Sequence, residues 1–287
     1  MLTHGNPLGF SAVASHLSIS DESFTAVCTG KNGKPDRMGQ VQHSRGKRSA
    51  HLTFMTNGEN SSALVASELL DELTLRAGEM EAINLLAECK ESDPAFEELR
   101  HNAFSIYGWE TVWQFPAKLP AAEPQEYLWE RMTAEDEPNV HTLYQTLVPP
   151  LVQTTEPYSG ADVHRLISRN NGELIAYVES DSGPNGIYLK PVVHPAAPAP
   201  RELLQELARI FQGLGRPVYL QMRSYQAWLT PFLEEIQATS AEHTALLVRH
   251  LTLPLLVRSA AARRLPYTQQ QTETSASITQ KFFEPPK

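Results

Sequence analysis

The sequence predicts an α/β (α+β) protein of two tandem domains, each a mixed, mainly antiparallel sheet flanked by helices. Three observations support this. Segments with alternating apolar residues, typical of half-buried strands, are interleaved with segments whose apolar residues recur at helical spacing. The length of 287 residues accommodates two ordinary domains, each with its own core. The pattern also repeats at an offset of 134 or 135 residues, in the pairs Leu69 and Leu203, Ile83 and Val218, and Leu99 and Leu233.

The composition limits the class of protein. Hydrophobic residues make up 41% and charged residues 20% of the chain, as in soluble globular proteins, and no run approaches the ~20 apolar residues that cross a bilayer. The first residues lack the basic start and continuous apolar stretch of a signal peptide, so we expect a cytoplasmic protein. The net charge of −9 opposes general nucleic-acid binding, which requires a basic face.

The cysteines and histidines predict neither a disulfide nor a metal centre. Cys28 and Cys89 are the only cysteines and fall in separate predicted strands, which indicates buried thiols. The histidines show no ligand spacing such as HExxH. Segment 31–48 is locally basic, and we interpret it as hairpin ends kept soluble by charge in preference to an anion-binding patch. Its charged residues are Lys31, Lys34, Asp36, Arg37, Arg45, Lys47 and Arg48.

The first domain is predicted to open with an antiparallel meander of three strands, at 23–29, 38–44 and 49–56. An Asn-Gly turn signal separates the first two strands. A long amphipathic helix follows, because apolar residues recur at helical spacing until Gly78, a residue type that ends helices. The residues of this stripe are Ala66, Leu69, Leu70, Leu73 and Ala77.

The remainder of the first domain is predicted as a buried strand, a short helix and a closing strand. Residues 82–89 are almost all apolar, as in a strand covered on both faces. Asp93 is placed to cap a helix that has Pro94 at its first position. The aromatic-rich segment 104–115 is predicted as the closing strand.

A proline-rich segment with little apolar bulk predicts a linker between the domains. We therefore divide the chain into a first domain at 1–116, a linker at 117–126, a second domain at 127–264 and a disordered tail at 265–287, which is rich in Gln, Thr and Ser. The second domain has an extra lead-in at 128–150, predicted as a strand, an acidic helix cap and a helix. Its other predicted elements are strands at 173–180 and 186–193, a helix at 201–215, a strand at 217–223, a helix at 224–236 with a break at Pro231, and a closing strand at 243–253.

This order of elements resembles the GNAT-type acyltransferase fold. The resemblance rests on AHLTFMTNGENSSALVASELL and AINLLAECKESDPAFEELRHNAF in the first copy, and on YLKPVVHPAAPAPRELLQEL and PVYLQMRSYQAWLTPFLEEI in the second. The copies cover most of residues 20–255, so the chain resembles a tandem GNAT protein whose first copy lacks the family's opening strand and helix. The segment LWERMTAEDEPNVHTLYQTL resembles that opening in the second copy.

The resemblance implies acetyl-CoA as co-substrate, with its pyrophosphate held by backbone N–H groups at a helix N-terminus in a Q/R-x-x-G-x-G/A loop. In the first copy the matching loop lacks a basic first residue and has Glu59 at a glycine position, where a carboxylate repels pyrophosphate. In the second copy the loop is 194–200, a poor site because three of its residues are prolines, which have no N–H to donate. The implied cofactor-binding residues are Thr56, Asn57, Gly58, Asn60, Ser61 and Ser62.

The sequence identifies no catalytic acid or base. The family often has a tyrosine acid on the last short helix, where this chain has Leu99 and Leu233. Other candidates, each more often structural, are Tyr107, Tyr188, His51 and Glu179. The resemblance implies an N-acetyltransferase that acts by positioning acetyl-CoA against a small-molecule or peptide amine. The alternative is a degenerate, non-catalytic pair that serves as a binding or protein-interaction module. Neither reading involves a nucleic acid or a membrane.

Overall fold

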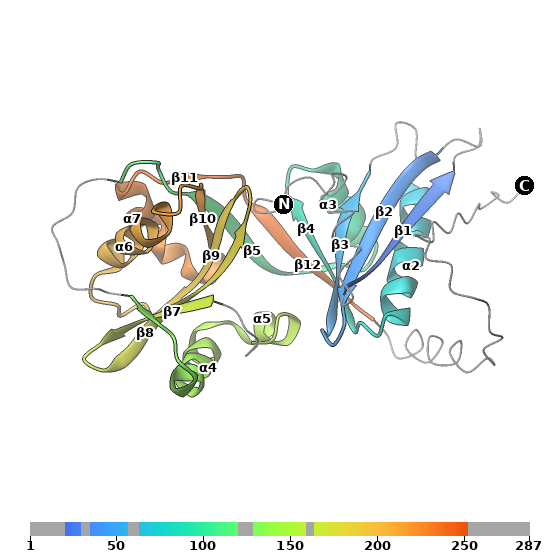
Figure 1. The fold of residues 1–287 in the computed structure, drawn as a ribbon. Helices are drawn as coiled ribbons and strands as arrows, with labels where there is room; N and C mark the ends of the chain where they lie inside the picture. Colours follow the sequence, from blue (N-terminus) through green and yellow to red (C-terminus); the bar gives the residue numbers. More distant parts are fainter. Residues whose placement is uncertain (1–20, 30–34, 57–62, 120–128, 159–163, 252–287) are drawn as a thin grey trace, which may run out of the picture. The chain divides into compact units, whose positions relative to one another are not determined.

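The computed structural model describes residues 21–29, 35–56, 63–119, 129–158 and 164–251, and divides into two compact units (Figure 1). The unit formed by the described residues up to Ile106 together with those from Leu246 is termed the N-terminal unit. The unit formed by Tyr107–Ala245 is termed the central unit. Within the described ranges, no helix is both long and apolar enough to cross a membrane.

The sheet of the N-terminal unit has the strand order β1-β2-β3-β4-β12. Its strands are β1 (Asp21–Thr29), β2 (Pro35–Ser44), β3 (Ser49–Met55), β4 (Asn84–Lys90) and β12 (Thr244–His250), and its helices are α2 (Ala63–Glu79) and α3 (Pro94–His101). The first three strands form the predicted antiparallel meander, and β3 pairs in parallel with β4. The N–H of Leu251 donates to the C=O of Ile83 at 2.9 Å, which holds the end of β12 beside the start of β4.

α2 packs against β1 and β2 (Figure 1). The predicted apolar stripe is confirmed, because each of its residues is at most 1% exposed. Gly39 on β2 permits the close approach of the helix, since a Cβ at this position would lie 2.8 Å from Cδ1 of Leu73. The start of α3 is also confirmed: the Asp93 carboxylate accepts a 2.9 Å hydrogen bond from the N–H of Ala95, and Pro94 lies in the first turn.

The sheet of the central unit has the strand order β5-β10-β9-β8-β7-β6, and β11 pairs with β5. Its strands are β5 (Ser105–Gln114), which enters this unit at Tyr107, β6 (Glu130–Arg131), β7 (His164–Asn170), β8 (Glu173–Gly183), β9 (Gly186–Val193), β10 (Val218–Arg223) and β11 (Thr239–Ser240). Its helices are α4 (Glu137–Leu147), α5 (Pro150–Thr155), α6 (Pro200–Gln212) and α7 (Thr230–Glu235), with 3-10 helices η1 (Ala134–Asp136) and η2 (Ser224–Leu229). β9 and β10 pair in parallel, and the other neighbours pair antiparallel.

Helices cover both faces of the central sheet (Figure 1). α6 and α7 pack on one face, where Leu203 and Leu233 join the buried core together with Leu220 of β10. α4 contacts β8 and β9 from the opposite face. Side chains of β8 alternate between the two faces, so Val178 belongs to the core under α6, whereas Glu179 lines a cavity beside α4 and α5.

The structure confirms the internal repeat. The order β1-β2-β3-α2-β4-α3 in the N-terminal unit recurs as β7-β8-β9-α6-β10-α7 in the central unit. In both, two antiparallel pairings are followed by one parallel pairing. The lead-in predicted at 128–150 forms β6, η1 and α4.

Each unit is completed by a closing strand from the other copy. Leu246–His250 of β12 groups with the N-terminal unit, and Tyr107–Gln114 of β5 groups with the central unit, where it pairs with β10. The boundaries predicted from the sequence instead place each closing strand in the domain of its own copy. The residue pattern of a strand does not specify which sheet the strand joins. That segments 1–116 and 127–264 each fold as an independent domain stays a prediction. The loop 57–62, most of the predicted linker and the predicted tail lie outside the described residues.

Three elements of the central unit, β7, α5 and the two-residue β11, were not predicted. The pattern of β7 is obscured by Arg165, a charged residue that is only 6% exposed. Glu179 on the neighbouring β8 accepts hydrogen bonds from this guanidinium at 2.8 and 3.0 Å, which satisfies the buried charge. The break predicted within 224–236 is confirmed, because η2 ends at Leu229 and Pro231 lies in the first turn of α7.

Asp136 closes a capping box at the start of η1 and α4. Its Oδ2 accepts hydrogen bonds from the N–H and Oγ1 of Thr133 at 2.8 and 2.7 Å, and its Oδ1 pairs with Arg169. The hydrogen bonds from Thr133, together with the charge of Arg169, lower the pKa of Asp136. A carboxyl with a lowered folded-state pKa stabilises the fold above its unfolded pKa of ~4 and loses this contribution as pH falls through the folded pKa.

We therefore expect Asp136→Asn to lower the free energy of unfolding by about 1 kcal/mol at neutral pH. The difference from the parent should shrink as the pH falls below about 4. Urea denaturation across this pH range measures it, with Asp181→Asn, at an exposed position of β8, as the control. A difference between parent and Asp136→Asn that is unchanged down to pH ~2 would contradict the role of the ionised carboxylate.

Candidate functional site

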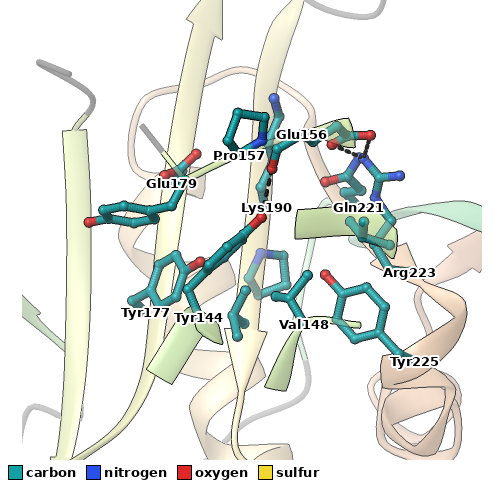
Figure 2. A pocket seen from close by; sticks show the side chains of 14 residues that line it. Tyr144, Val148, Glu156, Pro157, Tyr177, Glu179, Lys190, Gln221, Arg223 and Tyr225 are labelled. Carbon is teal, nitrogen blue, oxygen red and sulfur yellow. Dashed lines mark hydrogen bonds and ion pairs between the residues drawn. The ribbon is translucent and has the colours of Figure 1, made fainter. Parts of the chain in front are cut away.

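A cavity of about 160 Å³ lies in the central unit between the α4–α5 segment and the sheet (Figure 2). It lies where two strands separate, because β9 and β10 pair only through Ile187–Leu189 and Val218–Leu220. Residues of β9 and β10 beyond these pairs line the cavity. Their backbone N–H and C=O groups that would bond between the two strands must find other hydrogen-bond partners. The lining residues are Tyr144, Val148, Val152, Glu156, Pro157, Tyr158, Tyr177, Glu179, Lys190, Pro191, Val192, Gln221, Arg223 and Tyr225.

A charged network around Arg223, at the end of β10, forms one side of the cavity (Figure 2). Nη2 of Arg223 donates to both carboxylate oxygens of Glu156, at 2.9 and 3.1 Å, and its Nε lies 3.5 Å from Oε2 of Glu110. Gln221 donates to the same Glu110 oxygen at 2.6 Å, and the Tyr107 hydroxyl donates to Glu156. The side chains of Arg223 and Glu110 are only 11% and 6% exposed, so the ion pair is largely removed from water.

Burial and charge together set the protonation of this network. Burial acts to lower the pKa of Arg223, but Glu156 and Glu110 outweigh it and raise that pKa, so the guanidinium stays charged. Burial, followed by the charge of Glu156, raises the pKa of Tyr107. Burial also raises the pKa of Tyr225 to about 12, although Arg223 acts in the opposite direction. At neutral pH the charged guanidinium is therefore paired with the carboxylates of Glu110 and Glu156, and the phenols are neutral groups that can donate hydrogen bonds.

A second ion pair borders the cavity at Glu179 of β8, which Figure 2 shows at the left beside Tyr177. One oxygen of Glu179 accepts both hydrogen bonds from Arg165, and Nη1 of Arg165 lies 3.5 Å from Glu137. The guanidinium of Arg165 also lies 4.9 Å from the ring centre of Tyr158. Glu179 was a base candidate from the sequence, and the structure places it at the cavity in an ion pair.

Four tyrosine rings, Tyr144, Tyr158, Tyr177 and Tyr225, line the same cavity. The Tyr144 hydroxyl donates to the backbone oxygen of the residue that follows α5, at 2.6 Å. Within the described ranges, the hydroxyls of Tyr177 and Tyr225 have no hydrogen-bond partner, so both are available to a ligand. Aromatic faces beside carboxylates form an environment that favours an organic cation.

The loop between β9 and α6, residues 194–200, does not fit a pyrophosphate. Pro195, Pro198 and Pro200 have no N–H group. The N–H groups of Ala196 and Ala197 donate to His194 of the same loop, at 3.1 and 2.9 Å. Most of the donors that would bind an anion before α6 are therefore absent or already used, and the structure agrees with the poor site expected from the sequence.

Gln226 of η2 bonds to the backbone of β9 where β9 and β10 separate. Its Oε1 accepts from the N–H of Val193 and its Nε2 donates to the C=O of Pro191, both at 2.8 Å. The residue is 3% exposed. Neither Gln226 nor Tyr225 was singled out from the sequence. The available signal was the polar run Ser224-Tyr225-Gln226 directly after a buried strand.

In the N-terminal unit, the predicted cofactor loop leads from β3 into α2, a helix of 17 residues with no acidic residue in its first turn. Thr56, the first residue of the loop, is already bonded: its N–H donates to the C=O of Met38 at 2.8 Å, and its Oγ1 accepts from the N–H of Met38 at 2.9 Å. The other implied residues, Asn57, Gly58, Asn60, Ser61 and Ser62, lie outside the described residues.

Among the remaining sequence candidates, Tyr188 joins the Arg223 network through Glu110, whereas the others lie elsewhere. His51 is exposed on β3, Tyr188 donates to Glu110 at 3.3 Å, and Leu99 and Leu233 are buried. Cys28 and Cys89 are free and buried, as predicted, and burial raises the pKa of Cys89 to about 11. The residues that the structure describes contain no cluster of metal ligands.

In the described part of the basic segment 31–48, Arg45, Lys47 and Arg48 are exposed at the turn between β2 and β3, whereas Arg37 is buried. Arg37 is 5% exposed and forms two hydrogen bonds with Glu98, at 2.6 and 2.7 Å. Arg45 is exposed and lies 3.6 Å from Glu22. Because Arg37 is buried in an ion pair, it cannot contribute to an anion-binding surface.

Comparison with known proteins finds similarity at the level of fold. No protein-family model and no curated protein sequence matches the chain. A GCN5-related N-acetyltransferase from Kribbella flavida matches with a TM-score of 0.53 and 12% identity over 83% of this chain and 93% of that one. One from Sphaerobacter thermophilus matches with a TM-score of 0.51 and 11% identity, over 77% and 79%. A tandem GNAT protein from the clavulanic acid biosynthesis pathway covers 81% and 84%, with 11% identity and a TM-score of 0.47.

Proposed function

Because the chain has the GNAT-type acyltransferase fold, we propose that it is an N-acyltransferase that binds acetyl-CoA through its N-terminal unit and acts on a small-molecule or peptide amine. The supporting observation is the contrast between the two helix N-termini. The central unit has prolines and internally bonded N–H groups before α6. In the N-terminal unit, every residue from Asn57 to Ser62 has an N–H group, and the long helix α2 begins at Ala63 without an acidic first turn.

The cofactor-binding residues proposed for this unit are Asn57, Gly58, Asn60, Ser61 and Ser62, since the groups of Thr56 are bonded to β2. Acetyl-CoA, when bound, supplies an acyl group activated as a thioester. The backbone N–H groups and hydroxyls of the loop would bind and orient it, and positioning against the amine is the main contribution that we assign to the protein. Glu59 opposes this binding because it adds negative charge near the pyrophosphate.

We expect Glu59→Gly to tighten acetyl-CoA binding by about tenfold, because removing one like charge close to the pyrophosphate is worth about 1–2 kcal/mol. Isothermal titration of the parent and the variant measures this. Glu81→Gly is the matched control: it makes the same exchange after the other end of α2, where φ of Glu81 is 70° and glycine is tolerated. If neither the parent nor Glu59→Gly binds acetyl-CoA, the acyltransferase proposal fails.

A second candidate function is a non-catalytic amine-binding module, which the central unit favours. Its cavity has four tyrosine rings and two glutamates, with the hydroxyls of Tyr177 and Tyr225 available, beside a loop unsuited to pyrophosphate. The same titrations distinguish the two functions when benzylamine and its neutral analogue benzyl alcohol are added as probes. Binding of benzylamine alone, with no response to acetyl-CoA by the parent or by Glu59→Gly, would support the module.

A further inference from the structure

The separation of β9 and β10 creates a place where an extended chain could pair with the edge of β9. Past the last pair at Leu189 and Leu220, the C=O of Pro191 and the N–H of Val193 no longer have a partner on β10. Groups on alternate residues of a strand point to the same side, so one residue of an extended chain in the gap can accept from one of them with its C=O and donate to the other with its N–H, two groups that belong to successive amides.

Gln226 provides such an amide from within the chain. A glutamine side chain ends in one carbonyl acceptor and one N–H₂ donor, which can face the same side, as the C=O and N–H of one residue do in a strand. Its two 2.8 Å hydrogen bonds, to Val193 and to Pro191, therefore take the place of a neighbouring strand at this step of the ladder. With 3% exposure, the side chain is shielded from water, and breaking both bonds without replacement would leave buried polar groups unsatisfied.

The backbone holds Gln226 in this position. η2 is irregular at this residue, where φ is −113° and ψ is 16°, although 3-10 turns continue on both sides. The neighbouring Tyr225 lines the cavity, and Leu229 at the end of η2 is fully buried in the core. The segment is thus anchored on both sides of the glutamine, which makes its side chain a fixed part of the gap.

We propose that Gln226 fills a latent binding site for an extended amide between β9 and β10, and that the ligand it excludes is the pantetheine arm of coenzyme A. Pantetheine is a narrow linear chain with two secondary amides, so the C=O of one and the N–H of the other can form the two bonds that Gln226 now forms. This inference is independent of the proposed function, which concerns the N-terminal unit.

The test is to remove the amide and ask whether pantetheine takes its place. Gln226→Ala and Gln226→Ser empty the gap, whereas Gln226→Met keeps it filled and removes the hydrogen bonds. Each folded variant of the full chain, checked by circular dichroism, is titrated with pantetheine, which lacks the pyrophosphate that loop 194–200 cannot hold. Hydrogen exchange of the peptide covering β9 reports on the Val193 N–H and localises binding to the central unit.

We expect Gln226→Ala and Gln226→Ser to bind pantetheine at least tenfold more tightly than the parent and than Gln226→Met. In these two variants, exchange in the β9 peptide should be faster than in the parent and should slow again when pantetheine is added. If pantetheine slows hydrogen exchange in the β9 peptide as much in the parent as in the Ala and Ser variants, the proposal is overturned, because Gln226 would then not exclude it. Folded Ala and Ser variants that do not bind pantetheine would also overturn it. Neither result affects acetyl-CoA binding by the N-terminal unit.

Discussion

Replacing Arg223 by methionine is expected to lower the free energy of unfolding by about 3–5 kcal/mol, because the change leaves the buried Glu110 carboxylate without its cation. Arg223 is the only described cation within ion-pair distance of Glu110 and of Glu156. Methionine fills a similar volume, so the expected loss comes from the charge and its hydrogen bonds. Chemical denaturation followed by tryptophan fluorescence measures the effect.

Two controls separate this effect from general damage. Arg45→Met removes an exposed arginine whose partner is 3.6 Å away, and should cost less than about 1 kcal/mol. Combining Arg223→Met with Glu110→Gln should recover part of the stability, since a neutral amide is less costly to bury than an unpaired carboxylate. A loss below about 1 kcal/mol for Arg223→Met would show that the network is more hydrated than its burial indicates.

Leu247→Asp is expected to destabilise the N-terminal unit, although Leu247 lies in the second copy of the sequence pattern. Leu247 is on β12 and is fully buried. Aspartate has nearly the same branched shape, so the main change is the charge. The substitution therefore inserts an unpaired charge into the core, at a cost of several kcal/mol. Because β12 belongs to the sheet of the N-terminal unit, hydrogen exchange should rise in peptides from β3 and β4 more than in peptides from β8 and β9.

The matched control is Leu220→Asp on β10, which is equally buried but belongs to the central unit. This variant should show the opposite pattern, with faster exchange in β8 and β9. The domain boundary predicted from the sequence, 127–264, assigns both residues to one domain. If both variants accelerate exchange in the same set of strands, the strand exchange described here is wrong.

The two copies of the repeat differ in the loop before the long helix, which is α2 in the first copy and α6 in the second. In the central unit, α4 and α5 border a cavity at one face of the sheet, Gln226 bonds to the edge of β9, and the loop before α6 has three prolines and internally bonded N–H groups. In the sequence of the N-terminal unit, every residue from Asn57 to Ser62 has an N–H group before the long helix α2, and the lead-in that forms α4 precedes the second copy. We therefore propose different ligands for the two copies, an amine for the central unit and the pyrophosphate of acetyl-CoA for the N-terminal unit.

The elements of the fold were predictable because their signals are local. The apolar stripe of α2, the cap at Asp93 and the start of α7 at Pro231 each depend on residues within a few positions, and the structure confirms all three. The repeat was predictable for the same reason, since it only requires comparing two local patterns. Where a charged residue is buried by a partner on another strand, as for Arg165 and Glu179, the local pattern failed and β7 was missed.

The sequence by itself determined the α/β class, the internal repeat, most helices and strands, and the three prolines that remove backbone donors from the second loop. Only the tertiary structure decided which sheet each closing strand joins, and only it brought Arg223, Glu110 and Glu156 together. It also revealed that Gln226 bonds across the gap to Val193. The physical reason is that strand pairing, ion pairing and backbone capping are made between residues far apart in the chain, and their partners leave no signal in the spacing of neighbouring residues.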